Sequence, residues 1–186
     1  MNILFVSMVP FDSNTSATIQ NKGIIKGLIE LGHVVDIMTL KLNNNAISYD
    51  ESMNDINSIV KNTYYISLNP YYAKFMARKP RNDNSNNKNS NRIMTKLKTG
   101  IRNIIKKVYD GISIYDAQKF NVRQVSKVKL DYTRYDVIIS SSDPKSSHLI
   151  AEKIYKENRS CKAKWIQYWG DPMFIDITRK RDRRDK

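Results

Sequence analysis

Residues 2–40, NILFVSMVPFDSNTSATIQNKGIIKGLIELGHVVDIMTL, decide the fold of this protein. Residues 3–6 form a continuous apolar run, which is typical of a strand covered on both faces of a parallel sheet. A polar loop follows, and apolar residues then recur at roughly helical spacing up to Gly32, which stands where a helix C-terminal glycine belongs. Residues 34–40, VVDIMTL, supply a second strand. This order predicts a βαβ unit.

The same alternation of strands and helices continues along the chain. We expect further strands at 64–68, 137–139 and 164–168, and further helices at 52–60, 92–108, 114–129 and 145–157. Residues 80–91 are polar and low in complexity, so they predict a flexible loop. The pattern as a whole predicts an α/β fold, an open parallel Rossmann-like sheet of about five strands with helices on both faces. This domain spans residues 1–176, and a basic tail occupies 177–186.

Composition excludes several classes of protein. The 186 residues suffice for one α/β domain with its own core. The one cysteine, Cys161, excludes a disulfide framework and a multi-cysteine metal site, and no His, Cys, Asp or Glu pair has metal-ligand spacing. The N-terminus does not resemble a signal peptide, and no stretch approaches the ~20 apolar residues of a membrane span. We therefore expect no metal and a cytoplasmic location.

The net charge of +14 is concentrated in two segments. Residues 74–108 hold eleven basic side chains and one acidic one, and the basic tail is also strongly positive. The predicted helix at 92–108 has a basic polar face opposite an apolar stripe, which is typical either of a solvated surface or of contact with anionic lipid headgroups. We expect peripheral contact with the inner face of the plasma membrane through five of its side chains: Lys96, Lys98, Arg102, Lys106 and Lys107. Nucleic acid is not expected as a partner, because the segment lacks base-stacking aromatic residues.

Three polar loops follow strands of the predicted sheet, at 8–16, 140–148 and 169–176. Ligands of such sheets bind outside the carboxyl ends of the strands, so we expect these loops to converge on a site. His148 and Asp171 are the candidate catalytic residues, although His148 could instead be a partly buried helix residue and Asp171 could bind turn amides. The candidate substrate-binding residues are Pro10, Asn14, Thr15, Ser16, Ser141, Ser142 and Trp169.

The first loop does not carry the G-x-G-x-x-G fingerprint of dinucleotide-binding folds. Three of its residues, Asn14, Thr15 and Ser16, could cap the next helix and present its free amides to a phosphate, or could be a plain N-cap. The serines at 140–142 do not predict a nucleophile, because a single histidine in the next helix makes no triad.

Three segments of the sequence carry a resemblance to a known family. They are residues 1–39, with MNILFVS, Pro10, LIELGHVV and DIMT; residues 135–148, with YDVIISSS, Pro144 and His148; and residues 169–172, WGDP. In this order they resemble the N-terminal domain of GT-B-type glycosyltransferases of family 4. The first loop departs from the family, which often has a Gly-Gly pair where this chain has Asn14, Thr15, Ser16 and Ala17.

The resemblance implies a retaining transferase built from two Rossmann-like domains, the first binding mostly the acceptor and the second the nucleotide-sugar donor. It implies no cofactor beyond this co-substrate. The chain would then be the acceptor-side half, moving a hexose to a polysaccharide or lipid-linked acceptor, with the donor-binding domain outside it or on a separate subunit. Alone it would be inactive. The alternative is a non-catalytic Rossmann-like module that docks on a membrane surface or a partner protein.

Overall fold

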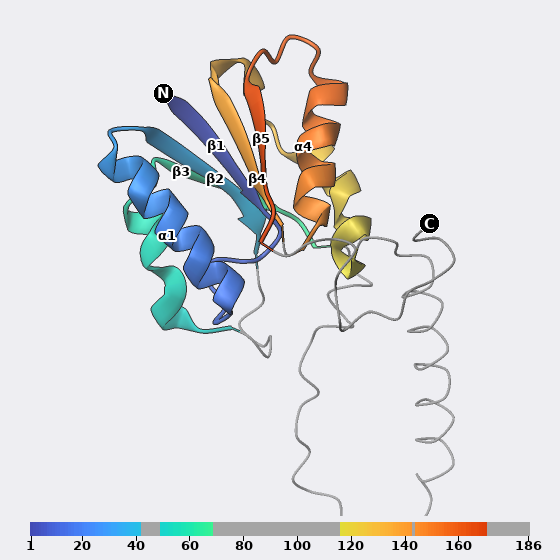
Figure 1. Cartoon of the computed structure of the whole chain (residues 1–186). Coiled ribbons are helices and arrows are strands. Elements are labelled where there is room, and N and C mark those ends of the chain that lie inside the picture. Colours follow the sequence, from blue (N-terminus) through green and yellow to red (C-terminus); the bar gives the residue numbers. More distant parts are fainter. Residues whose placement is uncertain (42–48, 69–115, 143, 171–186) are drawn as a thin grey trace, which may run out of the picture.

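A computed structural model of the chain describes residues 1–41, 49–68, 116–142 and 144–170. Its five strands form one all-parallel sheet in the order β3-β2-β1-β4-β5 (Figure 1). The strands are β1 (Asn2–Ser7), β2 (Val34–Leu40), β3 (Asn62–Ile66), β4 (Val137–Ser141) and β5 (Lys164–Tyr168). The predicted Rossmann-like α/β fold is confirmed, with β1 at the centre and the chain crossing from one half of the sheet to the other before β4.

Two α-helices and three 3₁₀ helices accompany the sheet within the described residues. They are α1 (Ser16–Glu30), α4 (Ser146–Glu157), η1 (Glu51–Ser58), η2 (Ala117–Lys127) and η3 (Tyr132–Arg134). The helices expected at 52–60 and 114–129 are therefore present, but each is wound as a 3₁₀ helix. The predicted loop at 80–91, helix at 92–108 and tail at 177–186 lie outside the described residues.

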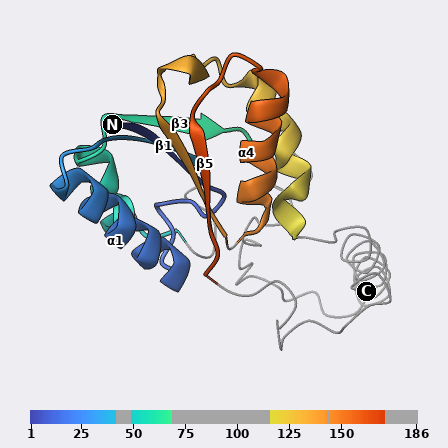
Figure 2. The same cartoon turned by 45° about the horizontal axis from the view of Figure 1, so that its top comes forward.

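Helices cover both faces of the sheet, on opposite sides in Figure 2. Successive strand residues point to opposite faces, so Ile3 and Phe5 pack with α1 and η1 whereas Leu4 and Val6 pack toward η2 and α4. All four side chains are fully buried, each stabilising the fold by about 1.5–3 kcal/mol through apolar burial. The continuous apolar run in β1 thus reflects a strand that has no solvent face.

The glycine expected to end the first helix does so. Gly32 has φ +79°, a left-handed conformation that glycine adopts without steric strain. Its N–H donates to the Ile29 carbonyl at 2.9 Å, and the next N–H, from His33, donates to the Leu28 carbonyl at 3.1 Å. This is a Schellman motif, which satisfies carbonyls that the helix end would otherwise leave unpaired. It turns the chain directly into β2.

The two edge strands differ from the central ones in exposure. On β5, Ile166 is 51% exposed, and on β3, Tyr65 is 43% exposed.

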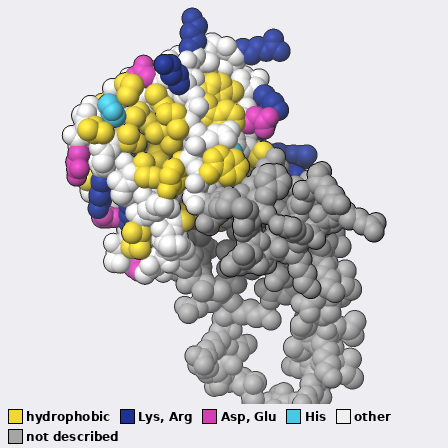
Figure 3. Space-filling view, in the orientation of Figure 1, with side chains coloured by type: hydrophobic (Ala, Val, Ile, Leu, Met, Phe, Trp, Pro, Cys, Tyr) yellow, Lys and Arg dark blue, Asp and Glu magenta, His cyan; other side chains and the backbone are white. Residues whose placement is uncertain are grey.

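In the view of Figure 3, apolar side chains gather on the face turned to the viewer, and Lys and Arg lie mainly around its margin. In the described part of the chain, no helix has both the length and the apolar character that a membrane crossing requires.

Candidate functional site

The segments that follow β1, β4 and β5 meet at the carboxyl edge of the sheet. The Met8 N–H donates to Ser147 Oγ at 2.9 Å, which joins the β1 loop to the first turn of α4. The Gly170 N–H donates to Ser142 Oγ at 2.7 Å, which joins the ends of β4 and β5. Parallel strands bring their carboxyl ends to one edge, so the expected convergence of these segments occurs.

His148 is held at the centre of this edge by a chain of hydrogen bonds. Its Nδ1 lies 2.7 Å from Ser140 Oγ, which in turn accepts the indole N–H of Trp165 at 2.8 Å. The residue is only 6% exposed, and its Nε2 is buried with no hydrogen-bond partner among the described residues. Burial, and then the charge of Lys145, lowers the pKa of His148 to about 4. His148 is therefore neutral at pH 7.

Trp169 places an exposed aromatic face beside His148. The two ring centroids are 4.3 Å apart with the planes tilted by 37°. The Trp169 indole N–H donates to Gln167 Oε1 at 3.1 Å, and the residue remains 41% exposed. An aromatic face next to a buried, unpaired polar atom is the combination that binds a ligand having both apolar and hydroxyl surfaces.

The serines at the end of β1 and β4 are occupied in a buried network. Ser141 Oγ donates to Asn21 Oδ1 at 2.6 Å, and Asn21 Nδ2 donates to Ser7 Oγ at 3.0 Å. Asn21 is 1% exposed and comes from α1, so the network fixes that helix against both strands. Ser141, a predicted substrate contact, has an internal partner here. The sequence offers no signal for Asn21, since a single polar residue within a helix is usually exposed.

The first loop is a helix cap. Thr15 Oγ1 accepts the Thr18 N–H at 3.2 Å, which makes Thr15 the N-cap of α1, and Ser16 is the first residue of that helix. Asn14 Nδ2 donates to Asp50 Oδ2 at 3.0 Å, and the Pro10 carbonyl accepts from Ser13 Oγ at 2.6 Å. Thr15 thus caps α1, as both alternatives for this loop require.

Six predicted site residues lie outside the described part of the chain. Asp171, the second candidate catalytic residue, lies outside the described part of the chain. The five predicted membrane-contact residues also lie outside it: Lys96, Lys98, Arg102, Lys106 and Lys107. Within the described residues, no group of three or more His, Cys, Asp or Glu side chains could hold a metal ion.

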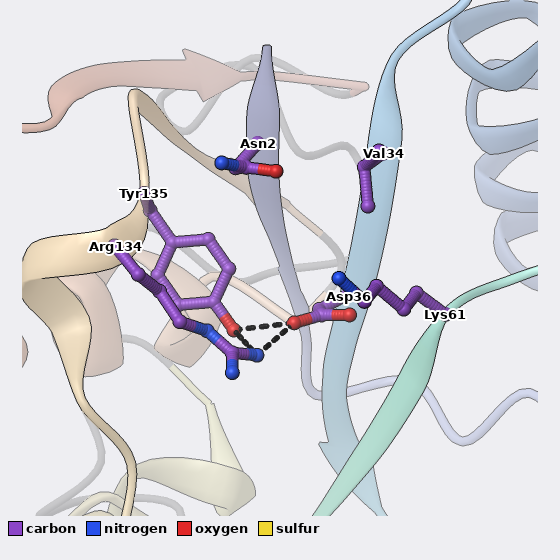
Figure 4. Close-up of a pocket in the computed structure, with 6 residues that line it drawn as sticks. All are labelled: Asn2, Val34, Asp36, Lys61, Arg134 and Tyr135. Atoms are coloured by element: carbon purple, nitrogen blue, oxygen red, sulfur yellow. Dashed lines mark hydrogen bonds and ion pairs between the residues drawn. The ribbon is translucent and has the colours of Figure 1, made fainter.

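A pocket of about 180 Å³ opens at the opposite, amino-terminal edge of the sheet (Figure 4). It surrounds Asp36 of β2, whose carboxylate accepts from the Tyr135 hydroxyl at 2.6 Å and from Asn62 Nδ2 at 2.9 Å, and forms an ion pair with Arg134. Burial, and then the hydrogen bond to Asp36, raises the pKa of the Tyr135 phenol above its usual range. Both Asp36 oxygens are engaged by protein partners, so this cluster is structural. It joins residues that lie about a hundred positions apart, and nothing in the sequence links them.

Comparison of the chain with protein-family models, with curated proteins and with solved structures found no match. The description of the carboxyl edge therefore rests on the structure alone. Its features are a neutral buried histidine, an exposed tryptophan and a network of hydroxyl groups.

Proposed function

We propose that the described sheet is the acceptor-side domain of a retaining, GT-B-type glycosyltransferase that moves a hexose from a nucleotide-sugar to a polysaccharide or lipid-linked acceptor. The observation that carries this proposal is His148 Nε2, a buried polar atom with no hydrogen-bond partner among the described residues, at the ligand-binding edge of a Rossmann-like sheet. Buried polar atoms normally have a partner, and an unpaired one in this position favours a bound ligand as that partner.

Trp169 favours a sugar as this ligand. The residue is 41% exposed, and its ring lies 4.3 Å from the His148 ring, centroid to centroid. The aliphatic face of a hexose packs on an aromatic ring while its hydroxyls need polar partners, and the pair supplies both.

The helix ends at this edge favour a neutral ligand over a phosphate. The first turn of α4 is already occupied by the Asp116 carboxylate, which accepts from the Ser146 N–H at 2.7 Å and from its hydroxyl at 2.6 Å. The amino end of α1 is capped by Thr15. A phosphate at a helix amino terminus accepts hydrogen bonds from these same backbone donors. At α4, the Asp116 carboxylate already occupies this position. This supports binding of the neutral acceptor, with the diphosphate of the donor held by a second domain.

In this proposal His148 binds and orients a hydroxyl. A general acid must carry a proton at the working pH, and a histidine with a pKa of about 4 does not carry the extra one near neutrality. We therefore propose that His148 positions the substrate and does not act as a general acid, and the catalytic role of Asp171 stays a prediction.

Saturation-transfer NMR tests the proposal with the full chain and with glucose, galactose, mannose and N-acetylglucosamine as probes. We expect at least one of these neutral sugars to receive magnetisation from the protein, and the signal to fall in the His148→Ala and Trp169→Ala variants. Tyr65→Ala, which removes another exposed aromatic ring on the far edge of the sheet, is the matched control and should bind as the wild type does. Failure of every neutral sugar to bind, or micromolar calorimetric binding of a UDP- or GDP-sugar that survives His148→Ala, would overturn it.

Peripheral membrane attachment is the second part of the proposal, and it rests on the sequence. Five of the basic residues in segment 92–108, Lys96, Lys98, Arg102, Lys106 and Lys107, would each contribute about 1 kcal/mol near an anionic surface before screening by salt. Co-sedimentation with anionic vesicles should therefore weaken as salt rises and when these residues are changed to Gln. Absence of vesicle binding at low salt would overturn the proposed membrane attachment. It would leave the proposal of a sugar site unaffected.

A further inference from the structure

We infer that Ser140 and Trp165 hold His148 in the tautomer that carries its proton on Nε2, so that the carboxyl edge presents a fixed N–H donor to an oxygen atom of a neutral ligand. The tautomer follows from the hydrogen bonds alone, whereas the identity of the ligand as a sugar rests on the proposed function.

The direction of the hydrogen-bond chain is set by Trp165. An indole N–H can only donate, so the 2.8 Å contact makes Ser140 Oγ an acceptor. The Ser140 hydroxyl still has one hydrogen to donate, and the residue is fully buried. His148 Nδ1, at 2.7 Å, is the acceptor that the described residues place within its reach. Ser140 therefore donates to Nδ1, because the reverse direction would leave its own hydrogen buried without an acceptor.

The tautomer of His148 follows from this direction. A nitrogen that accepts a hydrogen bond carries no proton, and a neutral imidazole has one proton to place, so that proton is on Nε2. The doubly protonated form is disfavoured by burial and by the charge of Lys145. His148 Nε2 is thus a buried N–H donor with no acceptor among the described residues.

The acceptor that fits this donor is a neutral oxygen, such as a hydroxyl oxygen of a sugar. The neighbouring helix end is already neutralised by the Asp116 carboxylate, which argues against an anion beside it. Trp169 lies against the imidazole and is 41% exposed, so a ligand that packs on its ring lies beside His148. Ser140 and Trp165 act through His148 and are positioning residues, since neither has a free polar atom for the ligand.

Nitrogen NMR of the ¹⁵N-labelled full chain at pH 7 tests the tautomer directly. The chain contains two histidines, and His33→Gln assigns the signals. We expect His148 to show an unprotonated, pyridine-like Nδ1 and a protonated, pyrrole-like Nε2. The opposite pattern in the wild type would overturn the inference, so the result does not depend on any variant folding.

Two variants test the positioning residues. Ser140→Ala removes the donor to Nδ1, and Trp165→Phe frees Ser140 to accept from an Nδ1–H instead, so both should shift the two nitrogen signals toward a mixture of tautomers. Ser126→Ala, which removes a hydroxyl bonded to Glu157 at a distance from this chain of bonds, should leave them unchanged. Unchanged signals in folded Ser140→Ala and Trp165→Phe would contradict the positioning role.

Adding the neutral sugar that binds separates the inference from the proposed function. We expect the Nε2–H proton to move downfield while Nδ1 stays unprotonated. An Nε2–H tautomer with no response to a bound sugar would overturn the ligand assignment and retain the tautomer, and an Nδ1–H tautomer with sugar binding would do the reverse.

Discussion

His148 shows how burial selects the chemistry of a side chain. A histidine near its usual pKa of about 6.5 could exchange protons at neutral pH. This one is 6% exposed, and its neighbours are a serine hydroxyl, an indole ring and a lysine. None of them stabilises a positive charge as a carboxylate would, so the neutral ring is favoured and its role becomes hydrogen bonding.

The same burial predicts a pH dependence of folding stability. The unfolded chain takes up a proton on His148 as the pH falls through about 6.5, whereas the folded chain resists protonation until about 4. The stability contributed by neutral His148 is complete above pH 6.5 and is lost as the pH falls toward 4, by an amount on the order of 3 kcal/mol. Urea unfolding at pH 7.5, 6.0 and 5.0 should show a smaller loss for His148→Gln than for the wild type. Equal losses in both proteins would contradict the lowered pKa.

Two helices far apart in sequence share one capping residue. Asp116 precedes η2 and accepts the Gln118 N–H at 2.8 Å, and it also accepts the Ser146 N–H at the start of α4 at 2.7 Å. An acidic side chain at a helix amino end satisfies unpaired donors and complements the helix dipole. Because η2 and α4 pack on the same face of the sheet, one carboxylate can serve both.

Replacing this shared cap should destabilise the chain more than the loss of an ordinary cap. A lost N-cap costs about 1 kcal/mol, and Asp116→Ala removes the acceptor at two helix ends, so we expect a loss of about 2 kcal/mol in the free energy of unfolding. Asp131→Ala, which removes the cap of the short η3 alone, is the control and should cost about half as much. Chemical denaturation measures both. A loss for Asp116→Ala no larger than that for Asp131→Ala would show that the two helix starts are independent.

At the amino-terminal edge, the two halves of the sheet are joined by the Asp36 cluster. This cluster consists of Asp36, Asn62, Arg134 and Tyr135. Asp36 lies on β2, whereas Arg134 and Tyr135 immediately precede β4, so the cluster joins both halves of the sheet across β1 (Figure 4). The carboxylate side chain is 4% exposed and Arg134 is 41% exposed. The buried member therefore depends on its partners, while the arginine retains access to water.

Removing the buried carboxylate should weaken the entire domain. Asp36→Ala leaves Tyr135 and Asn62 without their acceptor, and breaking a buried pair costs about 3–5 kcal/mol. Because Arg134 can return to water, we expect a loss below this range, about 2–3 kcal/mol, with an unchanged denaturant m-value. Lys26→Gln breaks an ion pair whose two side chains are both 49% exposed and should change stability by less than about 1 kcal/mol. Equal effects of the two substitutions would mean that burial adds nothing to the Asp36 pair.

The sequence by itself determined the elements of this protein and their order. Strands such as β1 and β2 need apolar residues on both faces, and Gly32 is required by a left-handed helix end, so both leave local signals that can be read along the chain. Parallel strands separated by crossovers then direct the loops after β1, β4 and β5 to one edge, which is why part of the candidate site was also predictable.

Only the tertiary structure decided what the individual polar side chains do. Ser141 donates to Asn21, and His148 Nδ1 lies 2.7 Å from Ser140 Oγ. Hydrogen-bond partners and pKa values depend on which atoms lie within about 3 Å and on how much water is excluded. Those distances join residues up to about 120 positions apart, and no local pattern of residue types encodes them.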